Sequence, residues 1–241
     1  MLRLGRMCYR QALGVQERLV RRVQEAEARG EGGQDTLVLV EHAPVYTTGL
    51  RSKVYSSQEE ERLRALGADF VRTNRGGLIT FHGPGQLVAY PVVNLRQLAP
   101  PESRRKALLG MKWYVDRLEQ CVIDLLGEMG VRGERSPHTG VWVTSGGEIS
   151  KICAMGVHNS NMVTSHGLAL NCVTDMRWFS HIVPCGIEGA GVVSLEQLLG
   201  RGEQVEVAAV GERLVTAFAR TFQCEVREVG EGVKEEVLAN L

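Results

Sequence analysis

The stretch 75–86, with the sequence RGGLITFHGPGQ, constrains the fold of this chain more than any other segment. Its glycines allow positive φ angles and close approach of the backbone to a ligand, and Pro84 stiffens the tip between two of them. Because this composition excludes a helix interior and is too rich in glycine for an ordinary strand, we expect a loop. A long turn is one interpretation, but Arg75 and His82 at the two ends favour a binding loop.

The composition is typical of a globular protein. The chain has 241 residues, of which 44% are apolar and 23% charged, and no linker, repeat or low-complexity tract interrupts it. We therefore expect a single α/β domain over residues 1–241. The formal net charge of zero gives no indication of nucleic-acid binding, and no apolar run is long enough to cross a bilayer.

The cysteines are scattered, with no CxxC pair and no zinc spacing. With this length and no secretory leader, we do not expect a disulfide framework. Most of them should be reduced and buried, where a thiol packs as a small apolar group. They are Cys8, Cys121, Cys153, Cys172, Cys185 and Cys224.

Hydrophobic periodicity and turn residues predict an alternation of strands and helices. Capping boxes and proline pairs mark several of the helix starts. The expected strands are 2–4, 36–40, 69–73, 87–93, 141–143, 149–157, 163–170 and 224–229. The expected helices are 9–28, 57–66 capped by Ser57 with Glu60, 100–125 opened by Pro100 and Pro101, a short helix capped by Ser194 with Gln197, and 207–217.

Cys185 is the first candidate for chemistry. It lies between Pro184 and Gly186, outside any regular element, and the glycines that follow leave backbone amides unencumbered. Free N–H groups near a thiolate lower the pKa of the thiol and can hold an oxyanion. The alternative interpretation is an inert loop cysteine.

Lys151 is the second candidate, because it stands in the apolar strand expected over 149–157. Desolvation lowers the pKa of a lysine, and a nearby lysine lowers that of a thiol. The alternative is an exposed strand lysine. Cys153 lies on the same face of that strand and could compete as a nucleophile, although a cysteine inside a strand more often packs in the core. His82 and His166, each followed by a glycine, suit the lining of a site.

Motifs of several other enzyme classes are absent. The sequence contains no HExxH, no GxSxG and no GxxxxGK(S/T) motif. A metal hydrolase, a serine hydrolase of the GxSxG type and a P-loop nucleotide user therefore have no support. We expect neither a metal nor a cofactor.

Five separated motifs, taken together and in order, resemble the signature of the lipoyl(octanoyl) transferases, the octanoyl-acyl-carrier-protein:protein N-octanoyltransferases. The resemblance covers nearly the whole chain, and the run HIVPCG at 181–186 is more similar to the mitochondrial, animal-type members than to the bacterial ones. The motifs are RGGLITFHGPGQ at 75–86, GVW at 140–142, KICAMG at 151–156, SHGLALN at 165–171 and PCG at 184–186.

The resemblance implies a catalytic domain of the biotin/lipoate protein ligase type, with a mixed sheet flanked by helices. It also implies the reaction: an octanoyl group moves from acyl carrier protein to a cysteine of the enzyme, and then to the ε-amine of one lysine on a lipoyl domain. Cys185 matches the thioester nucleophile, and Lys151 matches the lysine that lowers its pKa. The residues that match the stretches around the acyl group are Arg75, Gly76, Gly77, Leu78, Ile79, Thr80, Phe81, His82, Ala154, Met155, Gly156, Gly167, Leu168 and Ala169.

This chemistry is consistent with the residues. A thiolate cleaves a thioester without ATP, in keeping with the missing phosphate loop. Small residues such as Ala154, Gly156, Gly167 and Ala169 would leave room for an eight-carbon chain, and each buried methylene contributes ~0.8 kcal/mol. Cys153 is then a packing residue or a neighbour of the acyl pocket.

Three alternatives stay open. An ATP-dependent lipoate-protein ligase on the same fold would need no nucleophilic cysteine, whereas a lipoyl or octanoyl amidotransferase would use one. The third is a catalytically silent module that binds lipoyl domains, and the presence of both Cys185 and Lys151 speaks against it.

The resemblance also implies partners and a compartment. The donor is octanoyl-acyl carrier protein, an acidic protein for which Arg104, Arg105 and Lys106 form a candidate basic patch, although a solvated helix start explains them as well. The acceptors are lipoyl domains of the glycine cleavage H protein or of 2-oxoacid dehydrogenase E2 subunits, with no nucleic-acid or membrane partner. We expect the mitochondrial matrix, with the cytoplasm as the alternative for a bacterial-type member.

Overall fold

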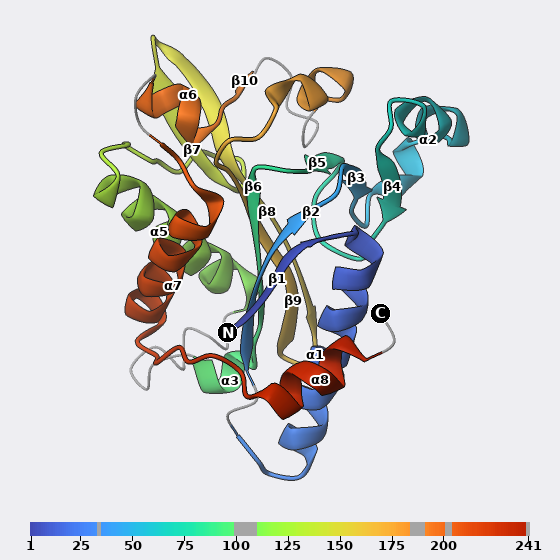
Figure 1. Cartoon of the computed structure of the whole chain (residues 1–241), viewed down its shortest axis with the longest axis vertical. Helices are drawn as coiled ribbons and strands as arrows, with labels where there is room; N and C mark the ends of the chain where they lie inside the picture. The colour runs from blue at the N-terminus through green and yellow to red at the C-terminus, as the bar shows by residue number, and fades with distance from the viewer. Residues whose placement is uncertain (33–34, 99–109, 184–190, 201–203, 240–241) are drawn as a thin grey trace.

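The computed structural model describes residues 1–32, 35–98, 110–183, 191–200 and 204–239, and a mixed sheet runs through its centre (Figure 1). In this part of the chain seven strands form the sheet. Outer pairs β1–β2 and β8–β10 are parallel and the other pairs are antiparallel. The order is β1 (Leu2–Met7), β2 (Thr36–His42), β6 (Gln86–Val92), β9 (Val163–Asn171), β8 (Glu148–Ser160) and β10 (Gly191–Val192), with β7 (Val141–Ser145) also paired to β8.

Helices cover both faces of this sheet (Figure 1). One face packs against α1 (Tyr9–Ala28) and α8 (Glu231–Leu238), and the other against α5 (Met111–Glu128) and α7 (Val207–Phe222). Side chains alternate along a strand, so Leu37 and Leu39 of β2 enter the α5/α7 core, whereas Val38 and Val40 enter the α1 core. This double burial explains why β2 and β6 are continuous apolar runs in the sequence.

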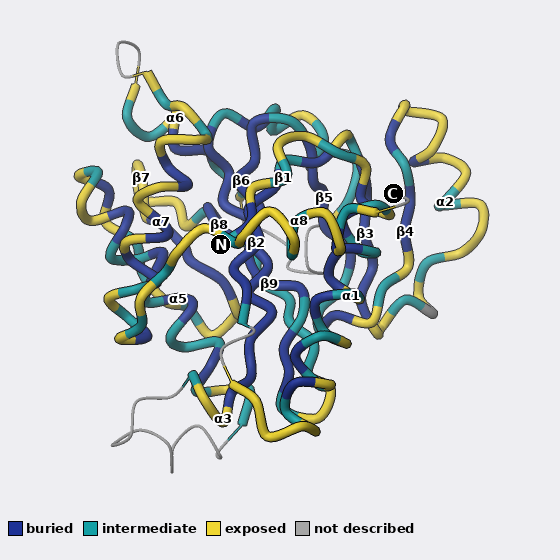
Figure 2. The backbone as a smooth tube through the Cα atoms, turned by 60° about the horizontal axis from the view of Figure 1, so that its bottom comes forward, coloured by how far each residue is buried: buried dark blue, intermediate teal, exposed yellow. Residues whose placement is uncertain are grey.

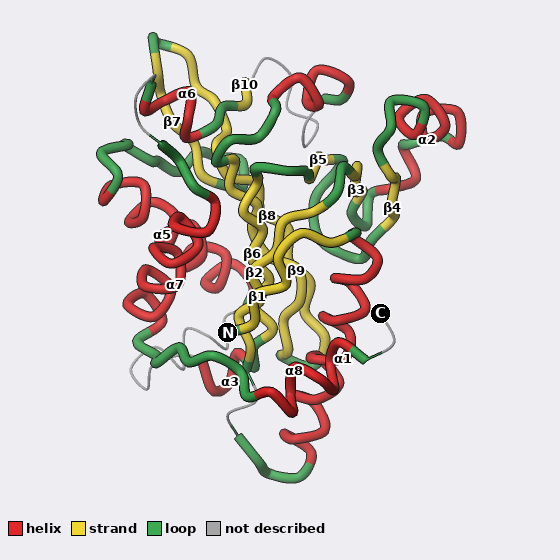
Figure 3. The backbone as a smooth tube through the Cα atoms, in the orientation of Figure 1, coloured by secondary structure: helices red, strands yellow, loops and turns green. Residues whose placement is uncertain are grey.

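A second, three-stranded sheet stands beside the first, in the order β4 (Asp69–Arg72), β3 (Val45–Thr48) and β5 (Thr80–His82). It lies with the 3₁₀ helix η1 (Ser52–Val54), α2 (Ser57–Arg64) and the 3₁₀ helix η3 (Met176–His181). Aromatic side chains form its core, where Phe81 stacks on Trp178 with ring centroids 5.0 Å apart. A loop leads from β5 of this small sheet to β6 of the central sheet (Figure 3).

Two short helices complete the described elements: α3 (Leu95–Leu98) and α6 (Leu195–Leu199). Ser194 caps α6 in the predicted capping box with Gln197. Buried backbone concentrates in the central strands and in the inner faces of α1, α5 and α7, and the exposed backbone lies at the rim (Figure 2). None of the described helices combines the length and apolarity needed to cross a membrane.

The structure corrects three expectations about helix ends and strands. Helix α5 begins at Met111 after Gly110, whose φ is 96°, so the proline pair at 100–101, which lies outside the described residues, does not open it. Helix α2 is capped by Ser56, whose hydroxyl accepts a hydrogen bond from the Glu59 backbone N–H at 3.2 Å, one residue before the predicted cap. Residues 224–229 form no strand but an irregular run, which is followed by the unpredicted helix α8.

The stretch 75–86 is not wholly a loop. Residues 80–82 pair with β3 in antiparallel fashion and form β5, and β6 begins at Gln86. The expectation that the stretch is too rich in glycine for a strand therefore fails in its central part. The reason is that Gly76, Gly77, Gly83 and Gly85 flank this strand and leave its own residues free of glycine.

Candidate active site

Arg75 is the residue around which the loop between β4 and β5 is folded. Its side chain is 6% exposed, and its guanidinium donates to the carbonyl oxygens of Gly76, Thr47 and Leu78 at 2.7–3.0 Å. It also donates to the hydroxyl of Thr47 at 2.9 Å. The cation thus fastens residues 75–78 to strand β3, because a guanidinium has several donors in one plane.

The same loop lies directly on strand β8. The backbone N–H of Gly76 donates to the carbonyl of Val157 at 3.0 Å. A Cβ atom on Gly156 would lie 2.7 Å from the carbonyl oxygen of Gly76, closer than such atoms approach. Glycine at 156 therefore lets the loop and the strand come together, and the two segments form opposite walls of a cavity.

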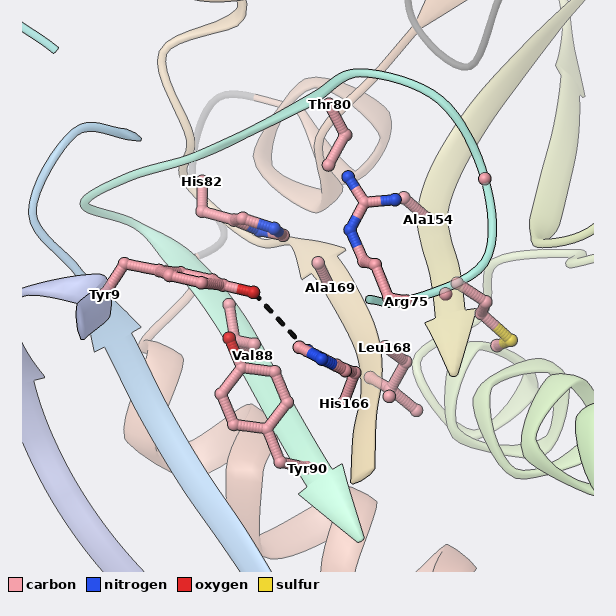
Figure 4. A pocket seen from close by; sticks show the side chains of 14 residues that line it. Tyr9, Arg75, Thr80, His82, Val88, Tyr90, Ala154, His166, Leu168 and Ala169 are labelled. Carbon is pink, nitrogen blue, oxygen red and sulfur yellow. Dashed lines mark hydrogen bonds between the residues drawn. The ribbon is translucent and has the colours of Figure 1, made fainter. Parts of the chain in front are cut away.

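This cavity lies between the loop and strands β6, β8 and β9 and is open to solvent, and the unfilled space in and in front of it amounts to about 410 Å³ (Figure 4). It brings together residues that are far apart in the sequence. Most of the positions that the resemblance assigned to the acyl group line it, together with His166, which the sequence suggested as a site lining, and three residues that were not predicted. The positions from the resemblance are Arg75, Gly77, Thr80, His82, Ala154, Met155, Gly156, Gly167, Leu168 and Ala169, and the unpredicted residues are Tyr9, Val88 and Tyr90.

Four predicted positions lie elsewhere. Gly76 lines a neighbouring cleft, and Leu78 accepts a hydrogen bond from Arg75 through its carbonyl. Ile79 and Phe81 are buried in the aromatic core of the small sheet. The strand alternation at 79–82 explains this outcome, since neighbouring side chains of an extended segment point to opposite sides.

One end of the cavity is polar and buried. The hydroxyl of Tyr9 lies 3.4 Å from Nδ1 of His166, and Figure 4 shows the two rings pointing at each other. Behind them, Nε2 of His42 lies 2.7 Å from the hydroxyl of Tyr90, and the ring of Tyr9 stacks on His82 with centroids 5.8 Å apart. This polar end consists of rings from α1, β2, β5, β6 and β9.

Burial keeps the imidazoles of the polar end neutral. Desolvation lowers the pKa of His42 to about 4 and that of His166 to about 3, the latter with help from the Arg75 cation. For His82, desolvation and then the nearby His42 and Arg75 side chains hold the pKa well below its usual value. At neutral pH these rings therefore act as hydrogen-bonding groups without charge.

Acidification should destabilise the fold through these rings. Because the folded-state pKa of His42 and His166 lies below the unfolded value of about 6.5, the unfolded chain binds protons first, and stability falls as the pH drops below that value. Each ring contributes up to roughly 1.4 kcal/mol per pH unit between about pH 6 and pH 4. The carboxyl of Asp35, whose pKa burial raises to about 6, acts in the opposite direction.

Urea unfolding at about pH 7, 6 and 5 measures this loss, and we expect the unfolding midpoint to decrease at each step. The variant His42→Gln removes one titrating ring that does not line the cavity. The free energy of unfolding of this variant should fall less steeply with decreasing pH than that of wild type, and the two slopes should differ by about 1.4 kcal/mol per pH unit. A wild-type midpoint that stays constant from pH 7 to pH 5 would contradict the neutral, buried state of the rings.

Lys151 lies in the neighbouring cleft and not in the cavity itself. Its side chain is 6% exposed, its Nζ donates to the carbonyl of Thr139 at 3.0 Å, and the ammonium lies 4.6 Å from the ring centre of Trp142. The alternative of an exposed strand lysine is therefore wrong. Gly77, Met155 and Gly156 line both the cleft and the cavity, so the lysine stands beside the mouth of the cavity.

The cysteines near this site differ sharply in their surroundings. Cys153 is fully buried in the α5/α7 core, and desolvation raises the pKa of its thiol far above the usual value. It does not line the cavity, so it packs in the core and is poorly suited to act as a nucleophile. Cys185 lies outside the described residues. Within the described residues, no three His, Cys, Asp or Glu side chains gather in a way that could hold a metal ion.

Glu119 of α5 holds the turn that carries the partner of Lys151. Its carboxylate is 8% exposed and accepts a hydrogen bond from the backbone N–H of Gly140 at 2.9 Å. Its second oxygen lies 3.3 Å from Nε of Arg135. Since Thr139 precedes Gly140 and accepts from Lys151, the carboxylate fixes the position of the lysine through this turn.

Removing this carboxylate should loosen the turn. Glu119→Ala leaves the buried N–H of Gly140 without its acceptor, which should cost roughly 1–3 kcal/mol of unfolding free energy and lower the rate of acyl transfer. Glu119→Gln is the matched control, because its amide oxygen still accepts a hydrogen bond from Gly140. This variant should therefore retain most of the stability and most of the transfer rate. Urea unfolding and transfer rates measure the two variants. Equal losses in both would contradict the anchoring role.

The sequence matches known proteins along nearly its full length. The family model of the lipoyl protein ligase A/B catalytic domain matches residues 8–219. The mitochondrial octanoyl-acyl-carrier-protein:protein N-octanoyltransferase of Xenopus tropicalis is 53% identical over 225 residues, covering 92% of this chain and 85% of that protein. The octanoyltransferase of Rubrobacter xylanophilus is 43% identical over 214 residues, covering 87% of both.

Solved structures of lipoate ligases share the fold. The bipartite lipoate protein ligase of Thermoplasma acidophilum superposes with a TM-score of 0.68 at 15% identity, covering 100% of this chain and 93% of that chain. Lipoate-protein ligase A bound with ATP gives a TM-score of 0.67 at 17% identity, covering 98% and 94%. These structures confirm the expected fold, a mixed sheet flanked by helices as in the lipoate ligases. The family match and the full-length relatives show that the chain belongs to the lipoyl(octanoyl) transferase family and is an acyltransferase.

Proposed function

We propose that this enzyme moves an octanoyl group from octanoyl-acyl carrier protein, through a thioester on Cys185, to the ε-amine of one lysine of a lipoyl domain. This is the first step of protein lipoylation. The observation that carries the proposal is the buried Lys151 ammonium beside the mouth of a cavity lined by small and apolar residues. An alkyl chain in the cavity would bring its carbonyl end to that mouth, through the shared residues Gly77, Met155 and Gly156.

The first half-reaction is an exchange of thioesters. The Cys185 thiolate attacks the carbonyl of the donor thioester, the new C–S bond forms, and the bond to the donor sulfur breaks. The released donor thiolate takes up a proton. Lys151, as a cation, stabilises the attacking thiolate, and such a pairing lowers the pKa of a thiol so that it is ionised near neutral pH.

The second half-reaction makes the amide. The lysine amine of the lipoyl domain attacks the acyl carbon, the C–S bond to Cys185 breaks, and the proton lost by the amine passes to the leaving sulfur by way of Lys151. When the octanoyl group leaves the cavity, its methylenes are exposed again, which costs about 0.8 kcal/mol each. An amide is more stable than a thioester, and this difference drives the release.

A transfer assay tests the proposal against ATP-dependent ligation. The protein is incubated with an apo lipoyl domain and either octanoyl-acyl carrier protein or free octanoate, each with and without ATP, and the mass of the domain is measured. We expect octanoylation of one lysine from octanoyl-acyl carrier protein whether or not ATP is present. A product that forms only from free octanoate and ATP would favour a ligase, and no product despite binding would favour a silent module.

The partners and the compartment are extensions of the same proposal. The donor would meet the candidate patch at Arg104, Arg105 and Lys106, which lies outside the described residues, and the acceptors would be the glycine cleavage H protein and 2-oxoacid dehydrogenase E2 lipoyl domains. The vertebrate relatives are named as mitochondrial proteins, which supports a place in the mitochondrial matrix. Parallel assays with H protein and an E2 domain would rank the acceptors, and imaging of the full-length protein in its own cells would test the compartment.

A further inference from the structure

A second cavity lies directly behind the polar end of the acyl cavity. It holds about 1,090 Å³ of unfilled space that opens to solvent between α1 and the ends of β8 and β9, and part of its lining is apolar, from Leu13, Val20 and Val163. The chain segments that line the acyl cavity continue into this groove. Tyr9, Arg75 and Gly167 line the first, whereas Gln16, Asn74 and Ser165 on the same segments line the second.

His166 separates the two cavities. Of the residues that the structure describes, it alone lines both. Its side chain is 1% exposed, and its Nε2 lies 2.7 Å from Oδ1 of Asn74. Since an amide oxygen only accepts, Nε2 carries the hydrogen and Nδ1 faces the hydroxyl of Tyr9 at 3.4 Å. The imidazole is thus held from both sides, by Asn74 at Nε2 and by Tyr9 at Nδ1. Figure 4 shows the contact with Tyr9.

The backbone of His166 has a strained conformation. Its φ is 58°, within the left-handed region that residues other than glycine rarely adopt, and it lies inside strand β9, paired with Val157 of β8. The carbonyl oxygen of the Gln16 side chain accepts from its N–H at 2.7 Å and fixes this conformation. Such strain persists only where surrounding contacts hold it, and it often marks a functional position.

We propose that the imidazole of His166 is the end wall of the acyl cavity and sets the longest acyl chain that the enzyme transfers. The proposal rests on the proposed function, because it assigns the limit of a chain that the cavity is proposed to bind. With the ring in place, the methyl end of an octanoyl chain stops at His166 and Tyr9. Without the ring, a longer chain passes into the groove along α1 and meets Leu13, Val20 and Val163.

His166→Gly tests the wall, because glycine adopts the left-handed φ freely and removes the whole ring. The rates of transfer, as kcat/KM, are measured with octanoyl-, decanoyl- and dodecanoyl-acyl carrier protein. Each further methylene that is buried against an apolar wall should raise kcat/KM by about fourfold. We therefore expect the ratio of decanoyl to octanoyl transfer to rise by about tenfold or more relative to wild type.

Two further variants separate a wall from a merely structural residue. His166→Asn keeps a polar group near Asn74 and tolerates the left-handed backbone, so it should give a smaller rise in the same ratio, and it decides the question if His166→Gly does not fold. His158→Ala enlarges the second cavity without opening the wall, and its decanoyl-to-octanoyl ratio should equal that of wild type.

A uniform loss of activity at every chain length, or a ratio unchanged in both His166 variants, would overturn the proposal and leave His166 as a folding residue. These outcomes differ from failure of the proposed function. If wild type transfers no acyl chain of any length, the proposed function itself fails. If wild type transfers octanoate and only the chain-length ratio fails to move, the inference about His166 fails alone.

Discussion

Replacement of Cys185 by serine should abolish acyl transfer. In the proposed mechanism the Lys151 cation keeps the Cys185 thiol ionised, whereas a serine hydroxyl is not ionised near neutral pH, so the variant lacks the nucleophile of the first half-reaction. We expect kcat to fall by on the order of 10⁴-fold or more, as it does when a catalytic nucleophile is removed from other enzymes. No octanoyl adduct should form on the variant, although the lipoyl domain and the donor should still bind.

Matched cysteine variants control for nonspecific effects. Cys8→Ser changes an exposed thiol, and Cys153→Ala changes the buried thiol two residues from Lys151. Both should keep the adduct, although Cys153→Ala should lose some stability because it opens space in the core. An adduct that persists on Cys185→Ser, or that disappears only from Cys153→Ala, would move the thioester away from Cys185.

Replacement of Lys151 by methionine should give the second largest effect. Methionine is similar in length and apolar, so it fills the space over Trp142 while removing the charge and the donor to Thr139. Loss of a positioned proton carrier slows a reaction by roughly 10²–10⁴-fold, and we expect a loss in this range near neutral pH. The acyl cavity should be intact, since Lys151 does not line it.

The pH dependence of Lys151→Met gives the sharper test. Without the cation that the proposed mechanism places beside it, the Cys185 thiol should need a higher pH to ionise, so its thiolate fraction should increase as the pH rises above neutral. Transfer by the variant should therefore recover in part as the pH rises from about 7 to 9, while wild type changes little. A variant whose rate stays equally low across this range would show that Lys151 acts on the proton transfers alone, and a fully active variant would remove it from the mechanism.

The fold followed from the sequence wherever one local signal decided the structure. The periodicity of residues 9–28 gave both ends of α1, and the apolar runs that become β2 and β6 are buried on both faces. The failures arose where tertiary contacts override the local signal. The run CEVREV at 224–229 contains two valines and resembles a strand, yet its backbone bonds to Ala219 and Met1 and pairs with none of the described strands of the sheet. Helix α8, which follows it, packs against α1.

The residues of the candidate site likewise fall into those that a local pattern predicts and those that tertiary contacts bring together. The glycine-rich loop and the small residues of β8 and β9 were recognisable because motif and composition are local. Tyr9, Tyr90 and His166 meet only because α1 packs across β6 and β9, and no local pattern records that meeting. Arg75 was recognised, but its partner Thr47 on β3 was not, for the same reason. His166, followed by a glycine, was the one member of the polar end with a readable signal besides His82.

Trapping the acyl-enzyme is the most direct test of the central claim, that the acyl group passes through a thioester on this protein. The protein is mixed with octanoyl-acyl carrier protein without ATP, quenched in acid, and weighed intact, and the adduct is mapped by peptide digestion. The account predicts one octanoyl group on Cys185 that disappears when an apo lipoyl domain is added before the quench. An unmodified enzyme that nevertheless octanoylates the lipoyl domain would contradict it, because transfer would then proceed directly from donor to acceptor.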